Sequence, residues 1–386
     1  MQNLEVELST IKLDSGKHTL RIPPRKEEQQ QHNYKSHFDF NTLLADIFQR
    51  DTGVELIGPP LLNLEELFNK SIIKIDGIEY DKNHMKIESI YRKCRILLPK
   101  VHDGKKIEIE YEGEVFSRDI QPNHYEVFQS SNVLVTQQRD NPLEWIGYWV
   151  SYHIKHHNID SVIIYDNNSS LYTTIELRAL LSKIKGLKSF CVVDWDIPYG
   201  AVGGEYQIWD SDFGQYQSWE HAYSRFLLKA NSVLICDIDE LVLHEDGAAI
   251  PDILESIEEP VITFKRRQIA EIASYPEYKH LPRMHCLTHL YEDNKPLYAP
   301  KYAFMPSKVS PDIHLLVHNV IGDKMFTSEK LLGRHFGALR IHWRNDNFSP
   351  IPLLTLEEYE NRYKKVLIED KQLKSSFEGV DLDWLE

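Results

Sequence analysis

Residues 232–240 read Ser-Val-Leu-Ile-Cys-Asp-Ile-Asp-Glu, an apolar β run that stops on two aspartates and a glutamate. Side chains alternate between the two faces of a strand, so Asp237 and Asp239 are expected on one face and Glu240 on the other. Buried carboxylates are costly unless a cation or hydrogen-bond donors meet them. Carboxylate oxygens suit the hard ions Mg²⁺ and Mn²⁺, which complete their shell with water and substrate phosphate. The stretch therefore predicts a divalent-cation site at the end of a buried strand.

Length and composition narrow the class of protein. A chain of 386 residues favours one large domain with a smaller one, or two domains. Its 44 Lys and Arg against 59 Asp and Glu give a net charge of −15 without any basic block, which argues against a nucleic-acid partner. The chain shows no secretory leader and no run of about 18 apolar residues, so we expect a soluble, cytoplasmic protein with at most peripheral membrane contact. The cysteines lack CxxC spacing and are typical of reduced core residues: Cys94, Cys191, Cys236 and Cys286.

Three regions differ in the rhythm of their sequence. Residues 1–130 hold a polar arm at 21–37 and then short alternating segments split by turn signals, which predicts a β-rich accessory domain. Residues 131–345 alternate strand and helix patterns, which predicts an α/β fold with a mostly parallel sheet and helices on both faces. Residues 346–386 predict a charged helical tail, either packed on the rest of the protein or a partner or left in solvent.

Helix starts are indicated by capping residues. Asn141 can cap a helix that has Pro142 at its first position. Thr173 and Glu176 have the spacing of a capping box. A further helix is expected over 215–230, directly before the 232–240 strand.

Polar residues follow each of the expected strands of the α/β region. Because the carboxyl ends of parallel strands meet at one edge of a sheet, these residues should converge on a single rim, where open α/β sheets bind ligands. The segments are Gln137–Asp140, Asp166–Ser169, Asp194–Asp196 and Asp237–Asp239.

Several motifs stand in an order that resembles one class of enzyme. The stretch LVTQQRDNPLEWIGYWVSYHIKHHNIDSVIIYDNNSS at 134–170 looks like the opening of GT-A glycosyltransferases of family 92 and of related family 2 type, with their EW…YH helix and YDNxS turn. Residues 215–241 resemble the helix and DxDEF strand of the same families, although Leu241 stands where Phe is usual. The resemblance spans roughly residues 130–345.

Two later segments extend this resemblance. Pro300-Lys301-Tyr302, followed by Pro306, Val309 and His314, is similar to the families' K…P…V…H segment. Ile341-His342-Trp343-Arg344 is similar to their HYR, with Trp343 in place of Tyr.

The resemblance implies a hexosyltransferase that moves a sugar from a nucleotide-sugar donor, a UDP- or GDP-sugar, to a glycan or lipid-linked acceptor in surface polysaccharide biosynthesis. Asp237 and Asp239 would hold Mn²⁺ or Mg²⁺ against the donor diphosphate, with His314 as a third ligand or a diphosphate contact. The implied donor-binding residues are Arg139, Asp166 and Asn168 at the nucleoside, and Asp237, His342 and Arg344 at the phosphates.

An inverting transfer also needs a carboxylate base beside the acceptor hydroxyl. Glu271 matches the position of a glutamate in the resembling families, and Glu240 is the second candidate, on the acceptor side. Glu292 and Asp293 are rivals, and a solvated carboxylate or a retaining mechanism stays open.

Two other features have a functional and a structural interpretation. His153 and His157 lie one helical turn apart and could share a zinc ion, but no Glu stands in HExxH register, so structural roles are favoured. The aromatic-rich stretch 199–219 could stack on a sugar ring or form a packed connection.

Two other function classes compete with sugar transfer. A phosphatase could use Asp237 as its nucleophile, although such enzymes place this motif near the chain start. A carbohydrate-binding protein without turnover could be built on the β-rich region. The donor sugar, the acceptor and the oligomeric state are not predicted, because they depend on loop-shaped pockets and surfaces.

Overall fold

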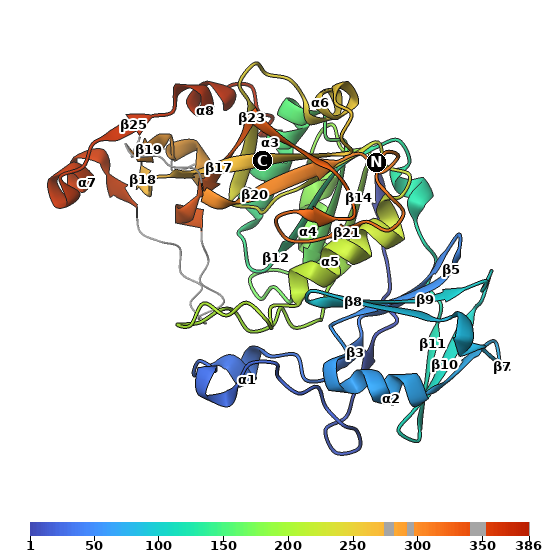
Figure 1. Ribbon diagram of the computed structural model, residues 1–386. Coiled ribbons are helices and arrows are strands. Elements are labelled where there is room, and N and C mark those ends of the chain that lie inside the picture. The colour runs from blue at the N-terminus through green and yellow to red at the C-terminus, as the bar shows by residue number, and fades with distance from the viewer. Residues whose placement is uncertain (274–281, 292–296, 340–352, 386) are drawn as a thin grey trace. The chain divides into compact units, whose positions relative to one another are not determined.

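The computed structural model describes residues 1–273, 282–291, 297–339 and 353–385, and the chain forms two compact units (Figure 1). Unit 1 comprises residues 1–5, 126–194 and 229–386, and unit 2 comprises residues 6–125 and 195–228. The expected boundary at 130 lies near one division between the units. Residues 195–228, however, which were expected inside the α/β domain, belong to unit 2. That residues 1–130, 131–345 and 346–386 are separate domains stays a prediction.

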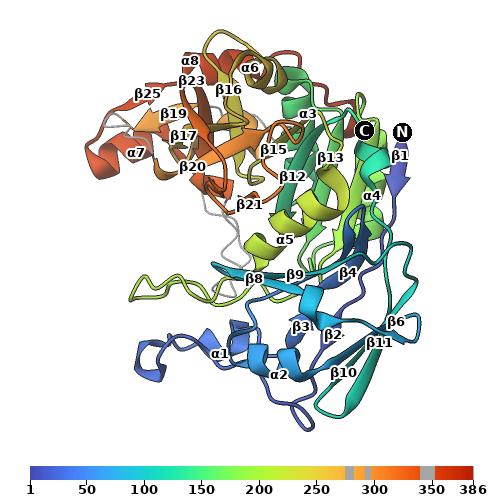
Figure 2. The same cartoon turned by 45° about the vertical axis from the view of Figure 1, so that its right-hand side comes forward.

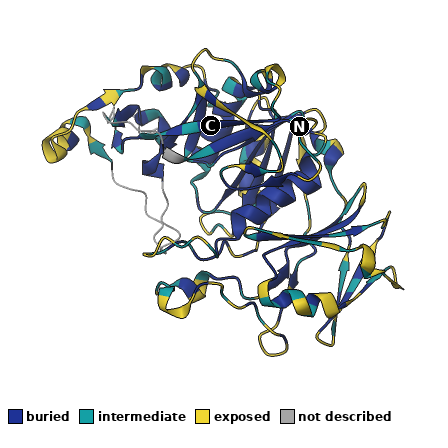
Figure 3. Ribbon diagram, in the orientation of Figure 1, coloured by how far each residue is buried: buried dark blue, intermediate teal, exposed yellow. Residues whose placement is uncertain are grey.

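The first half of the unit 1 sheet is parallel. In spatial order it contains β1 (Gln2–Leu4), β14 (Ser189–Asp194), β13 (Ser161–Asp166), β12 (Asn132–Gln138) and β15 (Ser232–Ile235). Val133 of β12 pairs with Ser161 on one side and with Val233 on the other. All residues of β13 are buried, as expected for a parallel strand covered on both faces. Figure 3 shows the middle of the unit 1 sheet mostly in the dark blue of buried residues. Apart from β1 at the edge, the strands follow the order 3-2-1-4.

The second half of the sheet is largely antiparallel. Its strands are β20 (Leu297–Phe304), β17 (Val261–Ile269), β19 (His289–Tyr291), β25 (Leu367–Glu369), β23 (Met325–Phe336) and β16 (Glu240–His244). Of these neighbours, β17 and β23 pair in parallel. Short strand pairs lie outside this sheet: β21 (His314–Leu315) with β22 (Val320–Ile321), and β18 (Ile272–Ala273) with β24 (Leu354–Thr355). The predicted α/β class is confirmed: one half of the sheet is parallel, and the other half is largely antiparallel and contains the parallel pair β17 and β23.

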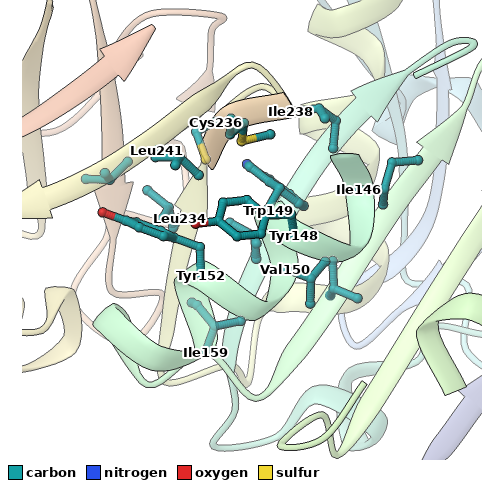
Figure 4. Packing of buried hydrophobic residues seen from close by; sticks show 14 of the residues in the cluster. Ile146, Tyr148, Trp149, Val150, Tyr152, Ile159, Leu234, Cys236, Ile238 and Leu241 are labelled. Carbon is teal, nitrogen blue, oxygen red and sulfur yellow. The ribbon is translucent and has the colours of Figure 1, made fainter. Parts of the chain in front are cut away.

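The longest helix packs its apolar side against the strand that leads to the carboxylates. Helix α3 (Leu143–His157) buries Trp149 and Tyr152 in a cluster that also holds Leu234 of β15, Cys236 and Ile238 (Figure 4). Helices α4 (Thr174–Lys183) and α6 (Ile250–Ser256) contribute to the same core. No helix in the described part of the chain is long and apolar enough to cross a bilayer.

The two predicted helix starts differ in outcome. Thr173 and Glu176 form the predicted capping box at the start of α4. At α3 the prediction of an Asn141 cap is wrong, because Pro142 is the N-cap and makes no side-chain bond. The Asn141 amide instead donates to Gln138 Oε1 at 3.3 Å, so the side chain serves the loop after β12.

The C-terminal residues pack on unit 1 and are not helical throughout. Helix α7 (Leu356–Tyr363) is followed by β25, which joins the sheet beside β19, and then by α8 (Lys371–Ser376). Leu373, Phe377 and Trp384 belong to the main core cluster. Of the alternatives for this region, packing on the protein itself is therefore the one observed.

Unit 2 is β-rich, as predicted (Figure 2). One sheet contains β4 (Asp46–Arg50), β5 (Gly53–Gly58), β9 (Lys93–Pro99) and β8 (Lys86–Ile90), and another contains β11 (Glu114–Asp119), β10 (Lys106–Tyr111), β6 (Ile72–Ile75) and β7 (Ile78–Glu79). Smaller elements are β2 (Ile11–Lys12) paired with β3 (Thr42–Leu44), and the helices α1 (Tyr34–His37) and α2 (Glu65–Lys70).

Buried ion pairs explain why residues 195–228 belong to unit 2. The expected helix over 215–230 is α5 (Gly214–Ala222), continued by a π-helical turn at Tyr223–Leu227. Glu220 of α5 pairs with Lys93 and with Arg95, and all three side chains are at most 3% exposed. Asp46 of β4 pairs with Arg225 at 2.7 Å. Removing one partner of such a pair leaves an uncompensated buried charge, so these contacts hold α5 to the β-sheet.

Gly147 tests the packing of the C-terminal residues on α3. A Cβ added to Gly147 would lie 2.5–2.8 Å from ring carbons of Trp384. We expect Gly147→Ala to lower the free energy of unfolding by about 1–3 kcal/mol, measured by urea denaturation. In a Trp384→Ala background the same substitution should cost little or should stabilise, because Ala favours helices over Gly by about 1 kcal/mol. Equal losses in both backgrounds would contradict this packing.

Candidate active site

The candidate site lies where the order of the parallel strands reverses. Strand β12 is the first parallel strand in the series along the chain from Asn132, and β15 is the fourth and lies on its other side. In open α/β sheets, ligands bind in the crevice outside the carboxyl ends of the strands at this switch point. Gln138 ends β12, and the segment with Asp237 follows β15.

The carboxylates lie in a tight turn between β15 and β16. Strand β15 ends at Ile235, and the Glu240 backbone N–H donates to the Asp237 carbonyl at 3.0 Å. Cys236 and Ile238 point into the core beside α3 (Figure 4), whereas the side chains of Asp237 and Asp239 are 32% and 19% exposed. The two aspartates therefore remain in reach of a ligand.

The prediction that Glu240 points away from Asp237 is wrong. Glu240 Oε2 accepts a hydrogen bond from the Asp237 backbone N–H at 3.1 Å, and its side chain is 1% exposed. The turn ends the strand alternation on which the prediction depended.

Two cations neutralise this turn from within the protein. Lys301 of β20 places Nζ 2.7 Å from Asp237 Oδ2 and 3.6 Å from Glu240 Oε2, and its side chain is fully buried. Arg266 of β17 pairs with Glu240 Oε1. Burial acts to raise the pKa of Asp237, but the Lys301 ammonium outweighs this effect, and the pKa falls to about 2. Asp237 is thus ionised across the physiological pH range.

Asp239 lies beside a histidine that the sequence patterns did not single out. His335 Nε2 is 3.3 Å from Asp239 Oδ2, and His335 Nδ1 is 2.7 Å from Gln268 Oε1. Burial acts to lower the pKa of His335, but the Asp239 carboxylate outweighs it, so the net shift is upward. Strand β23 brings this histidine to the site, because His335 pairs in register with Glu240 of β16.

The described residues contain one group of candidate metal ligands, and it consists of Asp239, Glu240 and His335. His314, the expected third ligand, is buried on β21 outside this group. His318 interacts electrostatically with Asp237, and its Nδ1 is 3.0 Å from the Pro300 carbonyl oxygen. Burial lowers the pKa of His318 to about 4, and the charges of Lys301 and Arg266 act in the same direction.

On the other side of the switch point, Asp166 organises the loop ends of β12 and β13. Its side chain accepts hydrogen bonds from the Gln138 amide and, at 2.6 Å, from the Ser169 hydroxyl. Asp166 is 5% exposed, and burial raises its pKa. The carboxylate is thus engaged with its own loop. Asn168, in the same turn, is exposed and has a left-handed φ of +59°.

Asp140, which belongs to the polar segment Gln137–Asp140 expected on this rim, joins the same two loops. It is fully buried and accepts hydrogen bonds from the backbone N–H groups of Ser170 and, at 2.9 Å, Leu171. The preceding Arg139 keeps 34% of its side chain exposed. Asp140 itself has a left-handed φ of +56°, which the sequence alone did not reveal.

Of the remaining predicted residues, Glu271 is described and the others are not. Glu271 is half-buried between β17 and β18, and its Oε1 would lie 3.0 Å from a Cβ added to Gly337. Gln268 Nε2, from the side chain that contacts His335, lies against the same position. His342, Arg344, Glu292 and Asp293 lie outside the described residues.

His153 and His157 use their ring nitrogens in hydrogen bonds within unit 1. His153 Nδ1 is 2.8 Å from the Trp149 carbonyl oxygen, and Nε2 accepts from the Val242 backbone N–H at 3.4 Å. His157 Nε2 is 2.9 Å from the Val242 carbonyl oxygen, and Nδ1 accepts from the Ile250 backbone N–H. Their roles are structural, in agreement with the favoured interpretation.

The buried His157 makes the stability of the fold sensitive to acid. Burial lowers the pKa of His157 to about 4. Between pH 6.5 and 4, His157 therefore binds a proton in the unfolded chain but stays neutral in the folded chain. We expect the free energy of unfolding to fall between pH 6.5 and 4 by on the order of 2–3 kcal/mol from this residue. His157→Gln should flatten that part of the profile, measured by urea denaturation, and the exposed His102→Gln should leave it unchanged. An unaltered profile in His157→Gln would count against this assignment.

In unit 2, the aromatic-rich stretch is anchored yet partly exposed. Arg25 donates to the carbonyl oxygens of Val202 and Ile208, which fixes the backbone of this loop. Tyr206 and Trp209 remain 58% and 46% exposed. Both the packed and the sugar-stacking interpretations are compatible with this arrangement.

Comparison with known proteins yields distant structural similarity. No family model and no curated protein matches the chain. Among solved structures, the apo WbbM bifunctional glycosyltransferase is 14% identical with a TM-score of 0.29, over 50% of this chain and 36% of its own. S. aureus TarS in complex with UDP-GlcNAc is 10% identical with a TM-score of 0.31, over 66% and 68%. HddC from Yersinia pseudotuberculosis is 10% identical with a TM-score of 0.31, over 54% and 93%. Similarities this low carry no conclusion about the chain's fold or activity.

Proposed function

We propose that this chain is a glycosyltransferase that moves a sugar from a nucleotide-sugar donor to a glycan or lipid-linked acceptor, with Mn²⁺ or Mg²⁺ as cofactor. One observation carries the proposal. The β12–β15 switch point has a hydrogen-bonding loop pair on one side and an accessible carboxylate with an imidazole, Asp239 and His335, on the other. A nucleoside diphosphate needs both features, polar contacts for the nucleoside and a cation for the phosphates.

The nucleoside side has exposed and supporting residues. Asn168 is exposed at the end of β13 and Arg139 is partly exposed at the end of β12, and we assign both to the nucleoside. Asp166 shapes the loop between them through Gln138 and Ser169. The loops provide direct contacts through exposed side chains and rigidity through buried ones.

The phosphate side has donor atoms that fit a divalent cation. A carboxylate oxygen and an imidazole nitrogen together suit Mn²⁺ better than Mg²⁺, which prefers oxygen ligands. When bound, such an ion would offset the negative charge on the departing nucleoside diphosphate. Asp237, held ionised by Lys301, orients this side of the site. His342 and Arg344 remain proposed phosphate contacts, and His314, which lies outside the group of Asp239, Glu240 and His335, remains a proposed ligand or diphosphate contact.

Hexosyl transfer with inversion is the finer part of the proposal. Glu271 is the proposed base, since its half-buried carboxylate lies beside Gln268, the partner of His335. Glu240 is a poor base, because both of its oxygens are engaged by protein donors, and we assign it a positioning role. A role in surface polysaccharide synthesis on the cytoplasmic side follows from the motif resemblance alone.

A phosphatase is the second candidate, favoured by one contact. The Lys301 ammonium keeps Asp237 ionised, as a carboxylate nucleophile requires. Release of inorganic phosphate from simple phosphomonoesters, lost in Asp237→Asn, would support this function in place of sugar transfer.

Nucleotide release tests the transferase. With Mn²⁺ and a panel of UDP- and GDP-sugars, the wild-type chain should release nucleoside diphosphate, and Asp239→Asn should slow this by at least about 100-fold, because a cation ligand is lost. Asp252→Asn, at an exposed position on α6, is the matched control and should be unaffected. An absence of release from every donor, or full activity of Asp239→Asn, would refute the proposal.

A further inference from the structure

The carboxylate turn contains its own counter-ion beneath Asp237. Lys301 Nζ contacts Asp237 Oδ2 at 2.7 Å, and the Lys301 side chain is 0% exposed while that of Asp237 is 32% exposed. Solvent and ligands therefore reach the aspartate but not the lysine. Lys301 cannot contact a bound phosphate, so its charge acts on the carboxylates.

Glu240 is occupied in the same way. Its Oε1 pairs with Arg266, and its Oε2 accepts from the Asp237 backbone N–H at 3.1 Å and lies 3.6 Å from Lys301 Nζ. Arg266 is itself fixed, since its Nε donates to the Ala299 carbonyl at 2.8 Å. By distance alone Glu240 belongs to the candidate ligand group with Asp239 and His335. Coordination of a cation by Glu240 would break contacts that are almost fully buried.

Asp239 differs from its two neighbours. In the part of the chain that the structure describes, its recorded ion pair is with His335 and not with a lysine or arginine. Gln268 Oε1, 2.7 Å from His335 Nδ1, favours a proton on Nδ1. This arrangement allows Nε2, the nitrogen facing Asp239, to act as a ligand once it is deprotonated.

We propose that Lys301 and Arg266 are positioning residues that keep Asp237 and Glu240 out of a cation's coordination, so that Asp239 and His335 are the ligands this turn provides. The inference rests on the cation-dependent part of the proposed function and assigns the ligands within it. Three carboxylates face two fixed cations, so the local charge is smaller than the acidic sequence suggests. The protein alone then binds the cation weakly, and the phosphates of the nucleotide complete its shell.

Manganese binding to the full chain tests this division, with free Mn²⁺ measured by electron paramagnetic resonance. Without nucleotide, Asp239→Asn and His335→Gln should weaken Mn²⁺ binding by at least about tenfold. Asp237→Asn should change it by less than about threefold. Lys301→Met should tighten Mn²⁺ binding by about fivefold or more, because the Lys301 ammonium then no longer competes with the cation for the Asp237 carboxylate. A merely structural lysine would not produce this effect.

A double variant controls for the possibility that a single substitution weakens Mn²⁺ binding by unfolding the protein. Asp237→Asn combined with Lys301→Met removes both charges and leaves no orphaned partner from this pair, so it should bind Mn²⁺ as the wild type does. Thermal unfolding of each variant is measured in parallel. The inference is overturned, and the proposed function is not, if Asp237→Asn weakens Mn²⁺ binding as much as Asp239→Asn does. Weaker Mn²⁺ binding by a folded Lys301→Met variant has the same consequence. Absence of Mn²⁺ binding by the wild type, even with UDP, overturns both the inference and the metal-dependent part of the proposed function.

Discussion

The parallel pairing of β12 with β15 is the interaction on which the candidate site depends. This pairing, in which Val133 lies opposite Val233, places the fourth parallel strand β15 beside the first, β12. The strand order therefore reverses at this position. Both loop systems of the site, the one that contains Asp140 and Asp166 and the one that contains Asp237, follow strands of this region. A one-residue slip in the pairing would exchange the inward and outward side chains, so the buried faces of both strands hold the register.

Charge compensation is the second constraint on the site. The turn after β15 concentrates three carboxylates, and Lys301 and Arg266 neutralise two of them from strands β20 and β17. This explains how an acidic turn forms in a protein with a net charge of −15 without requiring a bound ion to fold. It also separates the carboxylates by function, because Asp239 stays accessible beside His335 while Glu240 is enclosed.

Unit 2 illustrates a limit of pattern analysis. The apolar alternation of its strands and the turn signals between them predicted a β-rich region correctly. The helix over 214–222 also has a recognisable pattern, but its membership in unit 2 depends on Glu220 meeting Lys93 and Arg95, more than 120 residues earlier in the chain. Charged residues are ordinarily expected at the surface, so nothing in the local sequence indicates that these three are buried.

The sequence by itself determined the α/β class, the parallel strands around β12, the capping box at Thr173 and the placement of Asp237 and Asp239 directly after a buried strand, because these depend on local periodicity and on residues close together in the chain. Only the tertiary structure decided the orientation of Glu240, the buried role of Asp166 and the presence of His335 beside Asp239. The physical reason is the same in each case. A turn that ends strand alternation, a hydrogen-bonded loop and a register between distant strands are set by long-range pairing, which local sequence does not encode.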